Sequence, residues 1–152
     1  MRNIYKSILY ITLTLLILSA CDREDDIDEI FTGKTWYMNG ARISGKKLNS
    51  EISNFYTAAG KNAYYISFSS KIFKGSLSEG ADFSGTWSAN GKKQTVKLNI
   101  TSAPTLSNQF DKDIYKIISS ITSYQSGSDF LWLKKNSDNY VMFGNSRTKV
   151  YN

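Results

Sequence analysis

The sequence predicts an α+β fold that is mainly β: a curved antiparallel sheet or partly open barrel of about six to eight strands with two short helices. The 152-residue chain has 14% aromatic residues and one proline, and it is rich in Ser, Thr, Tyr and Gly. This composition favours strands and turns over helices. Several segments alternate apolar and polar residues, as half-buried strands do, and two repeat apolar residues at helical spacing.

The N-terminal segment has the features of a secretory signal peptide. Arg2 and Lys6 precede an apolar run over residues 8–18, and Leu18-Ser19-Ala20-Cys21 follows. At about eleven residues, the run is too short to span a bilayer as a helix. The quartet resembles the lipobox of bacterial lipoproteins. That resemblance implies cleavage after Ala20, lipidation of Cys21 and an outer-membrane lipoprotein of the cell envelope. The alternative is an ordinary signal peptide with a stray buried cysteine.

Residues 21–29 are expected to be the lipidated cysteine and an acidic flexible tether. Residues 22–29 hold six acids, one arginine and almost no apolar side chain. Such segments cannot bury enough apolar surface to fold. The acids after Cys21 resemble the surface-export signals of Bacteroidetes lipoproteins, which implies display on the cell surface. The alternative is a solvated spacer on a protein at the periplasmic face.

Residues 30–152 are expected to form a single basic domain. They carry sixteen lysines or arginines and seven acids, a formal net charge of +9. A basic domain attracts phosphates or anionic polysaccharide. The lysines are scattered near turns, however, so solubility and protection of sheet edges explain them as well. The sequence has no nucleic-acid-binding motif, and we expect no nucleic-acid partner.

The first half of the domain predicts three strands and a helix. The predicted strands are 34–38, 63–69 and 72–77, with a turn or bulge at Asn39-Gly40. Leu48, Ile52, Phe55, Tyr56 and Ala59 follow helical spacing, so a helix of about ten residues is expected over 48–59.

The second half predicts a hairpin, a helix and the last strands. Residues 83–89 and 95–101 alternate around Asn90-Gly91, a strong hairpin signal. The apolar positions of 110–121 predict the second helix, with Ser107 as its cap. Strands are expected over 130–134 and 140–143, and a short final strand over 148–151.

Two families resemble this domain. The stretch FKGSLSEGADFSGTWSANGKKQTVKLNI (73–100), a helix and SYQSGSDFLWLKK (123–135) resemble in order and spacing the META family of small bacterial envelope domains. The acidic leader followed by Gly33-Lys34-Thr35-Trp36 is similar to lipocalin-like lipoproteins of unknown function from gut Bacteroidales. These resemblances imply an envelope domain without a catalytic residue to transfer.

The composition argues against most catalytic chemistry. The chain has no histidine and a single cysteine, which removes the commonest general base, the commonest metal ligand and the usual nucleophile arrangements. No catalytic residue, metal or cofactor is therefore expected. An enzyme would have to use carboxylates facing each other across a cleft, drawn from Glu51, Glu79, Asp82, Asp111, Asp113, Asp129 and Asp138.

Aromatic residues are the better candidates for a site. Trp36 and Trp87 lie on faces that predict core packing. If Leu131 and Leu133 point inward, Phe130 and Trp132 point to the other face. Together with nearby Tyr140, they would form an exposed platform for a ligand or partner. The alternative is a helix that covers this face.

The function expected is therefore that of a lipid-anchored, non-enzymatic binding module. Its partners are the membrane, through the lipid anchor, and a glycan, a small molecule or a protein. A carboxylate-based envelope hydrolase and a structural or inhibitory subunit of an envelope assembly remain as alternatives. A hollow barrel would favour a small ligand, whereas a filled core with a surface patch would favour a partner.

Overall fold

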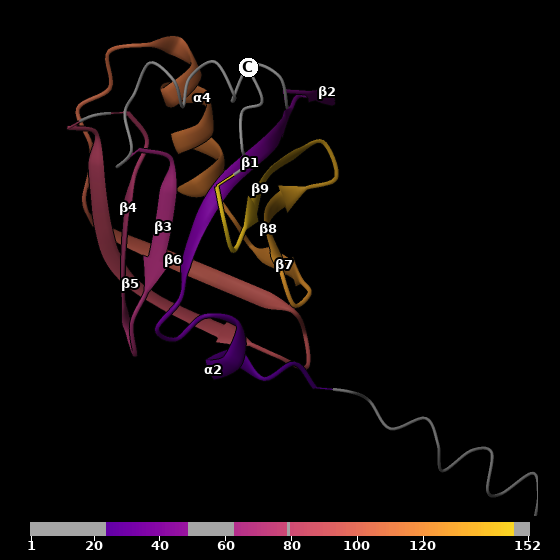
Figure 1. Cartoon of the computed structure of the whole chain (residues 1–152). Helices are drawn as coiled ribbons and strands as arrows, with labels where there is room; N and C mark the ends of the chain where they lie inside the picture. The colour runs from indigo at the N-terminus through magenta and orange to yellow at the C-terminus, as the bar shows by residue number, and fades with distance from the viewer. Residues whose placement is uncertain (1–23, 49–62, 79, 148–152) are drawn as a thin grey trace, which may run out of the picture.

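The computed structural model describes residues 24–48, 63–78 and 80–147. They form a sheet in which every neighbouring pair of strands is antiparallel, in the order β2-β1-β3-β4-β5-β6-β7-β8-β9. Strand β1 also pairs with β9, which closes the sheet into a ring (Figure 1). The predicted fold class is confirmed. The nine strands exceed the predicted six to eight because β2 has only two residues and β7 was not predicted.

The elements have the following bounds: α2 (Ile27–Ile30), β1 (Thr35–Ile43), β2 (Lys46–Lys47), β3 (Tyr65–Phe68), β4 (Ile72–Ser76), β5 (Asp82–Asn90), β6 (Thr95–Ser102), α4 (Gln109–Ile118), β7 (Ser123–Ser126), β8 (Phe130–Asn136) and β9 (Asn139–Gly144). The predicted helix at 48–59 and the predicted strand at 148–151 lie outside the described residues, apart from Leu48. Neither described helix has the length and hydropathy of a membrane span.

Strand β1 is longer than predicted and serves both halves of the ring. Its first residues pair with β3, and the stretch from Tyr37 to Arg42 pairs with β9. The register with β9 shifts between Met38 and Gly40, so the predicted irregularity at Asn39-Gly40 is a β-bulge. A bulge increases local twist, and this bend lets one strand join two parts of the sheet.

Closure is weakest between β6 and β7. The sheet register links them at one pair, Thr95 and Ser123. The Val96 amide donates to the Thr122 carbonyl and the Tyr124 amide to the Gln94 carbonyl, at 3.2 and 3.0 Å. The hairpin before this junction turns at the predicted place, and its loop, 91–94, has four residues.

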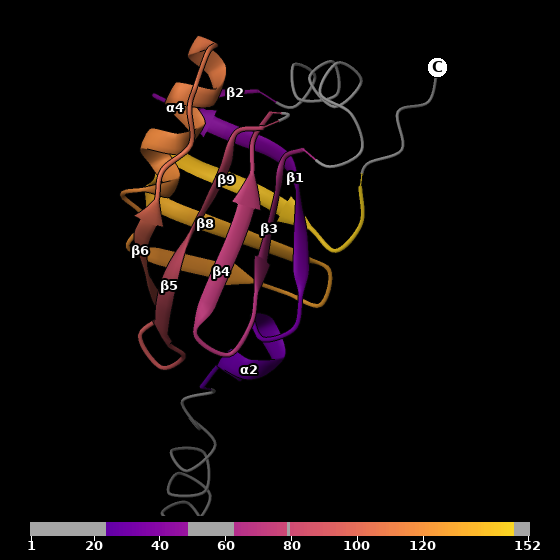
Figure 2. The same ribbon diagram turned by 90° about the vertical axis from the view of Figure 1, so that its left-hand side faces the viewer.

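The inside of the ring is filled by large apolar side chains. The most buried of them, below 2% exposed, come from several different strands and include Trp36, Phe73, Phe83 and Leu131. Helix α4 contributes apolar side chains to the same cluster and lies at one end of the ring (Figure 2). The predicted cap, Ser107, is wrong by one residue, because the Asn108 side chain accepts from the Asp111 amide at 2.8 Å.

The other end of the ring is covered by α2 and the chain around it. Asp26 caps this helix, accepting from the amides of Asp28 and Glu29 at 3.0 and 3.1 Å. Phe31 is 0% exposed and its ring meets Phe68 edge-on at 5.0 Å. The segment expected to be a flexible tether is, in its described part from residue 24 on, partly helical, and Asp25, Asp26 and Asp28 accept local and long-range hydrogen bonds.

Candidate functional site

The candidate site lies on the outer face of β8 and β9. Leu131 and Leu133 are 0% exposed and point into the ring. Successive residues of a strand alternate between faces, so Phe130, Trp132 and Lys134 point outward. The register places Tyr140 of β9 opposite Lys134, and it places Gln125 of β7 opposite Trp132. We call Gln125, Phe130, Trp132, Lys134 and Tyr140 the Trp132 cluster.

The structure brings the three predicted aromatic residues together. The rings of Trp132 and Tyr140 are stacked, with centroids 5.5 Å apart and planes 10° apart. The Phe130 ring lies 5.8 Å from Trp132 and is tilted by 52°. Stacked aromatic pairs contribute about 0.5–1.5 kcal/mol beyond area burial. The indole of Trp132 is therefore held in a defined orientation between two other rings.

The three rings differ in exposure. Phe130 and Trp132 are half-buried, whereas Tyr140 is only 7% exposed. Tyr140 therefore supports the indole and is too buried to offer a broad face of its own. The expected exposed platform of three rings is thus reduced to Phe130 and Trp132. The site thus centres on Trp132.

Helix α4 does not cover this face. Its buried apolar residues, Ile114, Ile117 and Ile118, belong to the same core cluster as Leu131 and Leu133, which lie on the inner face of β8. Within the described part of the chain, α4 thus packs on the opposite side of the sheet from Trp132. The other predicted helix, 48–59, lies outside the described residues apart from Leu48, so cover of Trp132 by that helix stays a prediction.

Two polar members of the cluster were missed by the sequence analysis. The ammonium of Lys134 lies 5.2 Å from the centre of the Trp132 ring, in cation–π geometry, and donates to the Gln125 side-chain oxygen at 2.6 Å. The i, i+2 spacing of Trp132 and Lys134 on one strand was a usable signal. Gln125 could not be found, because β7 has no clear alternation. The cluster combines an apolar ring with hydrogen-bonding groups.

The carboxylates that the structure describes do not form a catalytic pair; Glu51 and Glu79 lie outside the described residues. Asp111 is 0% exposed and accepts from the Tyr64 hydroxyl at 2.8 Å and the Asn108 amide at 2.7 Å, which is a structural network. Asp82, Asp129 and Asp138 are exposed. No group of three or more potential metal ligands occurs in the described ranges.

The described residues also line surface grooves at two places. One, of about 410 Å³, lies at the β6–β7 junction and is lined by residues including Asn90, Lys97 and Thr122. The other, of about 210 Å³, is lined by residues of β3 to β6, among them Lys74 and Asp82. Neither groove brings two carboxylates together, so neither has the geometry of a carboxylate-based hydrolase.

The remaining predicted residues are Trp36, Trp87 and Cys21. Trp36 is 1% exposed and its Nε1 donates to the Ile30 carbonyl at 3.1 Å, which confirms core packing. Trp87 is half-buried, packs on the core cluster, and donates to the Ser69 carbonyl at 2.8 Å. Cys21, the predicted lipidation site, lies outside the described residues.

Comparisons with known proteins agree with this fold. The model of a family described as a domain of unknown function, DUF4847, matches residues 22–145. A crystal structure of a DUF4847 family protein from Bacteroides vulgatus ATCC 8482 is similar, with a TM-score of 0.66 and 20% identity over 82% of this chain and 100% of that chain. A search of curated proteins gave no match. Because the family model spans most of the sequence, the chain belongs to the DUF4847 family.

Proposed function

We propose that this protein is a lipid-anchored outer-membrane protein of the bacterial cell envelope that binds a glycan through the Trp132 cluster and performs no catalysis. The Leu18-Ser19-Ala20-Cys21 quartet supports the anchor. The resemblances to META domains and to lipocalin-like lipoproteins support the envelope setting. The large side chains that fill the interior of the ring support a ligand site on its outside.

The observation that carries the glycan proposal is the Trp132–Tyr140 stack with Lys134 beside it. A sugar ring presents a C–H face that packs on an aromatic ring and hydroxyls that need hydrogen-bond partners. The half-buried indole supplies the apolar surface. The exposed Gln125 amide and the Lys134 ammonium supply donors and acceptors within the same cluster.

A protein partner is a weaker fit to this surface. Stable protein interfaces bury about 800 Å² on each side around an apolar centre. In the part of the chain that the structure describes, Ile72 on β4 is the one large apolar side chain that is mostly open to solvent, so no broad apolar surface surrounds Trp132. The Trp132 cluster offers half-buried rings flanked by polar groups, which suits one or two sugar units better than a broad interface.

The hydrolase alternative has no geometric support among the described residues. An acid–base pair requires two carboxylates about 5–10 Å apart across a cleft. The buried carboxylate, Asp111, accepts hydrogen bonds from Tyr64 and Asn108 and is not among the residues that line either groove. Binding without turnover is therefore the function that we propose.

A binding assay against an oligosaccharide array, followed by calorimetry on the best glycan, tests this proposal. Trp132→Ala should weaken binding about tenfold or more, since tenfold corresponds to about 1.4 kcal/mol, the scale of one lost stacking contact. Trp132→Phe keeps a ring and should lose less. Ile72→Ala, on another face, is the matched control and should bind normally.

Two results would contradict the proposal. One is unchanged glycan affinity in Trp132→Ala combined with a large drop in melting temperature, which would assign Trp132 to packing alone. The other is binding of a protein from the envelope, but of no glycan, by the wild-type chain.

A further inference from the structure

The described chain begins against one end of the ring. The Asp25 carboxylate accepts hydrogen bonds from Tyr124 and Gln94, at 3.0 and 3.2 Å. The backbone carbonyl of Asp25 lies so close to Gly91 that a Cβ atom on residue 91 would collide with the carbonyl oxygen. Residues 24–31 are therefore docked on the fold and do not form a free linker.

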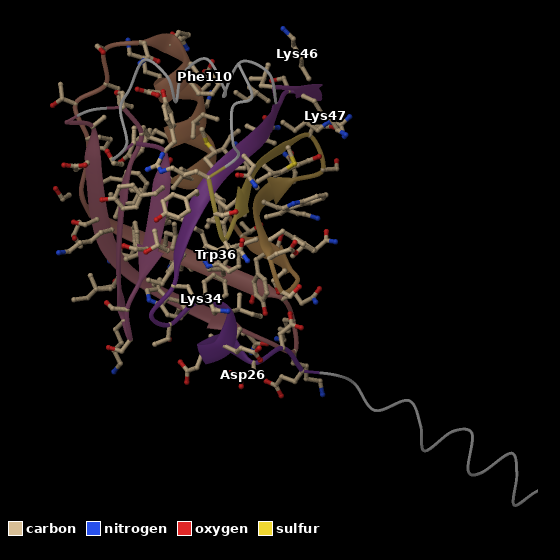
Figure 3. All side chains as sticks on the ribbon, viewed as in Figure 1. Asp26, Lys34, Trp36, Lys46, Lys47 and Phe110 are labelled. Carbon is tan, nitrogen blue, oxygen red and sulfur yellow. The ribbon has the colours of Figure 1, made fainter. Side chains whose placement is uncertain are left out.

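We call this region the α2 end: α2, the loop 91–94 and the β3–β4 turn, 69–71. The Trp87 ring lies 5.1 Å, between centroids, from that of Phe31, the residue after α2, and its Nε1 donates to the Ser69 carbonyl in the β3–β4 turn. Gln94 in the loop 91–94 donates to Asp25, just before α2. Figure 3 shows Asp26 and Lys34 at this end of the molecule and Lys46 and Lys47 at the opposite end.

Chain length limits how far this end can lie from a lipid attached to Cys21. Glu24 is the third residue after Cys21 in the sequence. A fully extended chain spans at most about 3.6 Å per residue, so this link covers at most about 11 Å. Acyl chains on Cys21 would sit in the hydrocarbon and hold the cysteine at the headgroups.

We infer that the α2 end of the ring rests on the lipid headgroups, with the docked segment 24–31 acting as a rigid mount. This inference depends on the proposed lipidation of Cys21. It replaces the expectation of a flexible acidic tether with a fixed orientation of the domain on the membrane.

The orientation comes from chain geometry and not from charge. The α2 end combines acids and lysines in nearly equal number, namely Glu24, Asp25, Asp26, Asp28 and Glu29 against Lys34, Lys71, Lys92 and Lys93. Attraction to anionic lipid should therefore be weak. Neutral and anionic membranes should hold the domain in the same way.

The same orientation keeps the Trp132 cluster accessible. The Gly45 amide donates to the Asp138 carbonyl at 3.0 Å, so the β8–β9 turn lies beside the β1–β2 turn. Those turns belong to the end that carries Lys46 and Lys47, away from α2 (Figure 3). Lys134 precedes the β8–β9 turn, so the cluster extends away from the headgroups.

Lysine footprinting on vesicles tests the inference. Cys21 is the only cysteine in the chain, so the mature form, Cys21 to Asn152, can be coupled to a maleimide lipid without cellular lipidation. The vesicles are phosphatidylcholine, with or without phosphatidylglycerol. Acetylation rates are measured by mass spectrometry and compared with uncoupled protein beside the same vesicles.

Coupling should slow acetylation of Lys92 and Lys93 several-fold and leave Lys46 and Lys47 unchanged, on both lipid mixtures. A Gly/Ser spacer of about twenty residues after Cys21 reaches about 25 Å and should abolish the protection. Equal protection at both ends, no protection, or protection that survives the spacer would overturn the inference. Because the anchor is installed chemically, such a failure is distinct from a failure of cellular lipidation.

Discussion

The phenol of Tyr124 donates a 3.0 Å hydrogen bond to the carboxylate of Asp25, which precedes it by 99 residues. Tyr124 is 2% exposed and its ring meets Phe31 edge-on at 5.2 Å. This bond therefore joins the segment 24–31 to β7, a strand of the ring, next to Phe31, which covers the end of the core. The segment 24–31 packs against the sheet.

Asp25→Ala should destabilise the domain by about 1–2 kcal/mol, because it removes a charge-assisted hydrogen bond and leaves a buried phenol without its acceptor. Chemical denaturation measures this change. Glu29→Ala is the control: that side chain is exposed on α2 and should stay within about 0.5 kcal/mol. In a double-mutant cycle with Tyr124→Phe, the two effects should be coupled; simple additivity would show that the bond contributes nothing.

Stability should fall at alkaline pH. Burial, followed by the hydrogen bond to Asp25 and the charges of Asp25 and Glu24, raises the pKa of Tyr124 well above its ordinary value of 10.0, and burial also raises the pKa of Tyr115. A raised folded-state pKa means that the unfolded chain loses its proton first. The contribution is therefore fully present below about pH 10 and is lost as pH rises above it.

Denaturation at several pH values between 9 and about 11.5 checks this expectation. In the Tyr124→Phe variant, the free energy of unfolding should fall less steeply with pH than in wild type. The two slopes should differ by at most the amount that corresponds to one proton released on unfolding. Parallel wild-type and variant curves over this range would mean that Tyr124 ionises equally easily in both states.

Tyr64→Phe should cost about 1–3 kcal/mol of stability, since it removes a donor from the fully buried carboxylate of Asp111. The matched control is Gln109→Ala, which removes a 3.0 Å bond to Asp113 at the exposed surface of the same helix. That change should cost about 0.5 kcal/mol or less. Similar losses in the two variants would remove the special role given to the buried bond.

The sequence could predict those strands whose apolar residues face the core. Tyr64, Ile66 and Phe68 alternate as expected and are all buried. The inward positions of Leu131 and Leu133 also fixed the outward direction of Trp132, and with it the centre of the candidate site. Alternation works here because one face of the sheet is packed and the other meets water.

Other features depended on contacts distant in sequence. Strand β7 has one buried residue, Tyr124, so it becomes a strand through its pairing with β8. The acidic segment was judged by its charge, whereas its aspartates cap α2 and accept from Tyr124. Gly91 was interpreted as a turn residue, but the structure also requires it for the close approach of Asp25.

The mass of the N-terminal peptide of the protein, isolated from bacterial membranes, measures anchorage directly. We expect a peptide that begins at Cys21 and carries a diacylglyceryl thioether and an acylated amine, and we expect Cys21→Ser to abolish both the modification and membrane retention. A peptide that begins at Met1, or at Cys21 with a free thiol, would contradict the lipid-anchored function proposed for this chain.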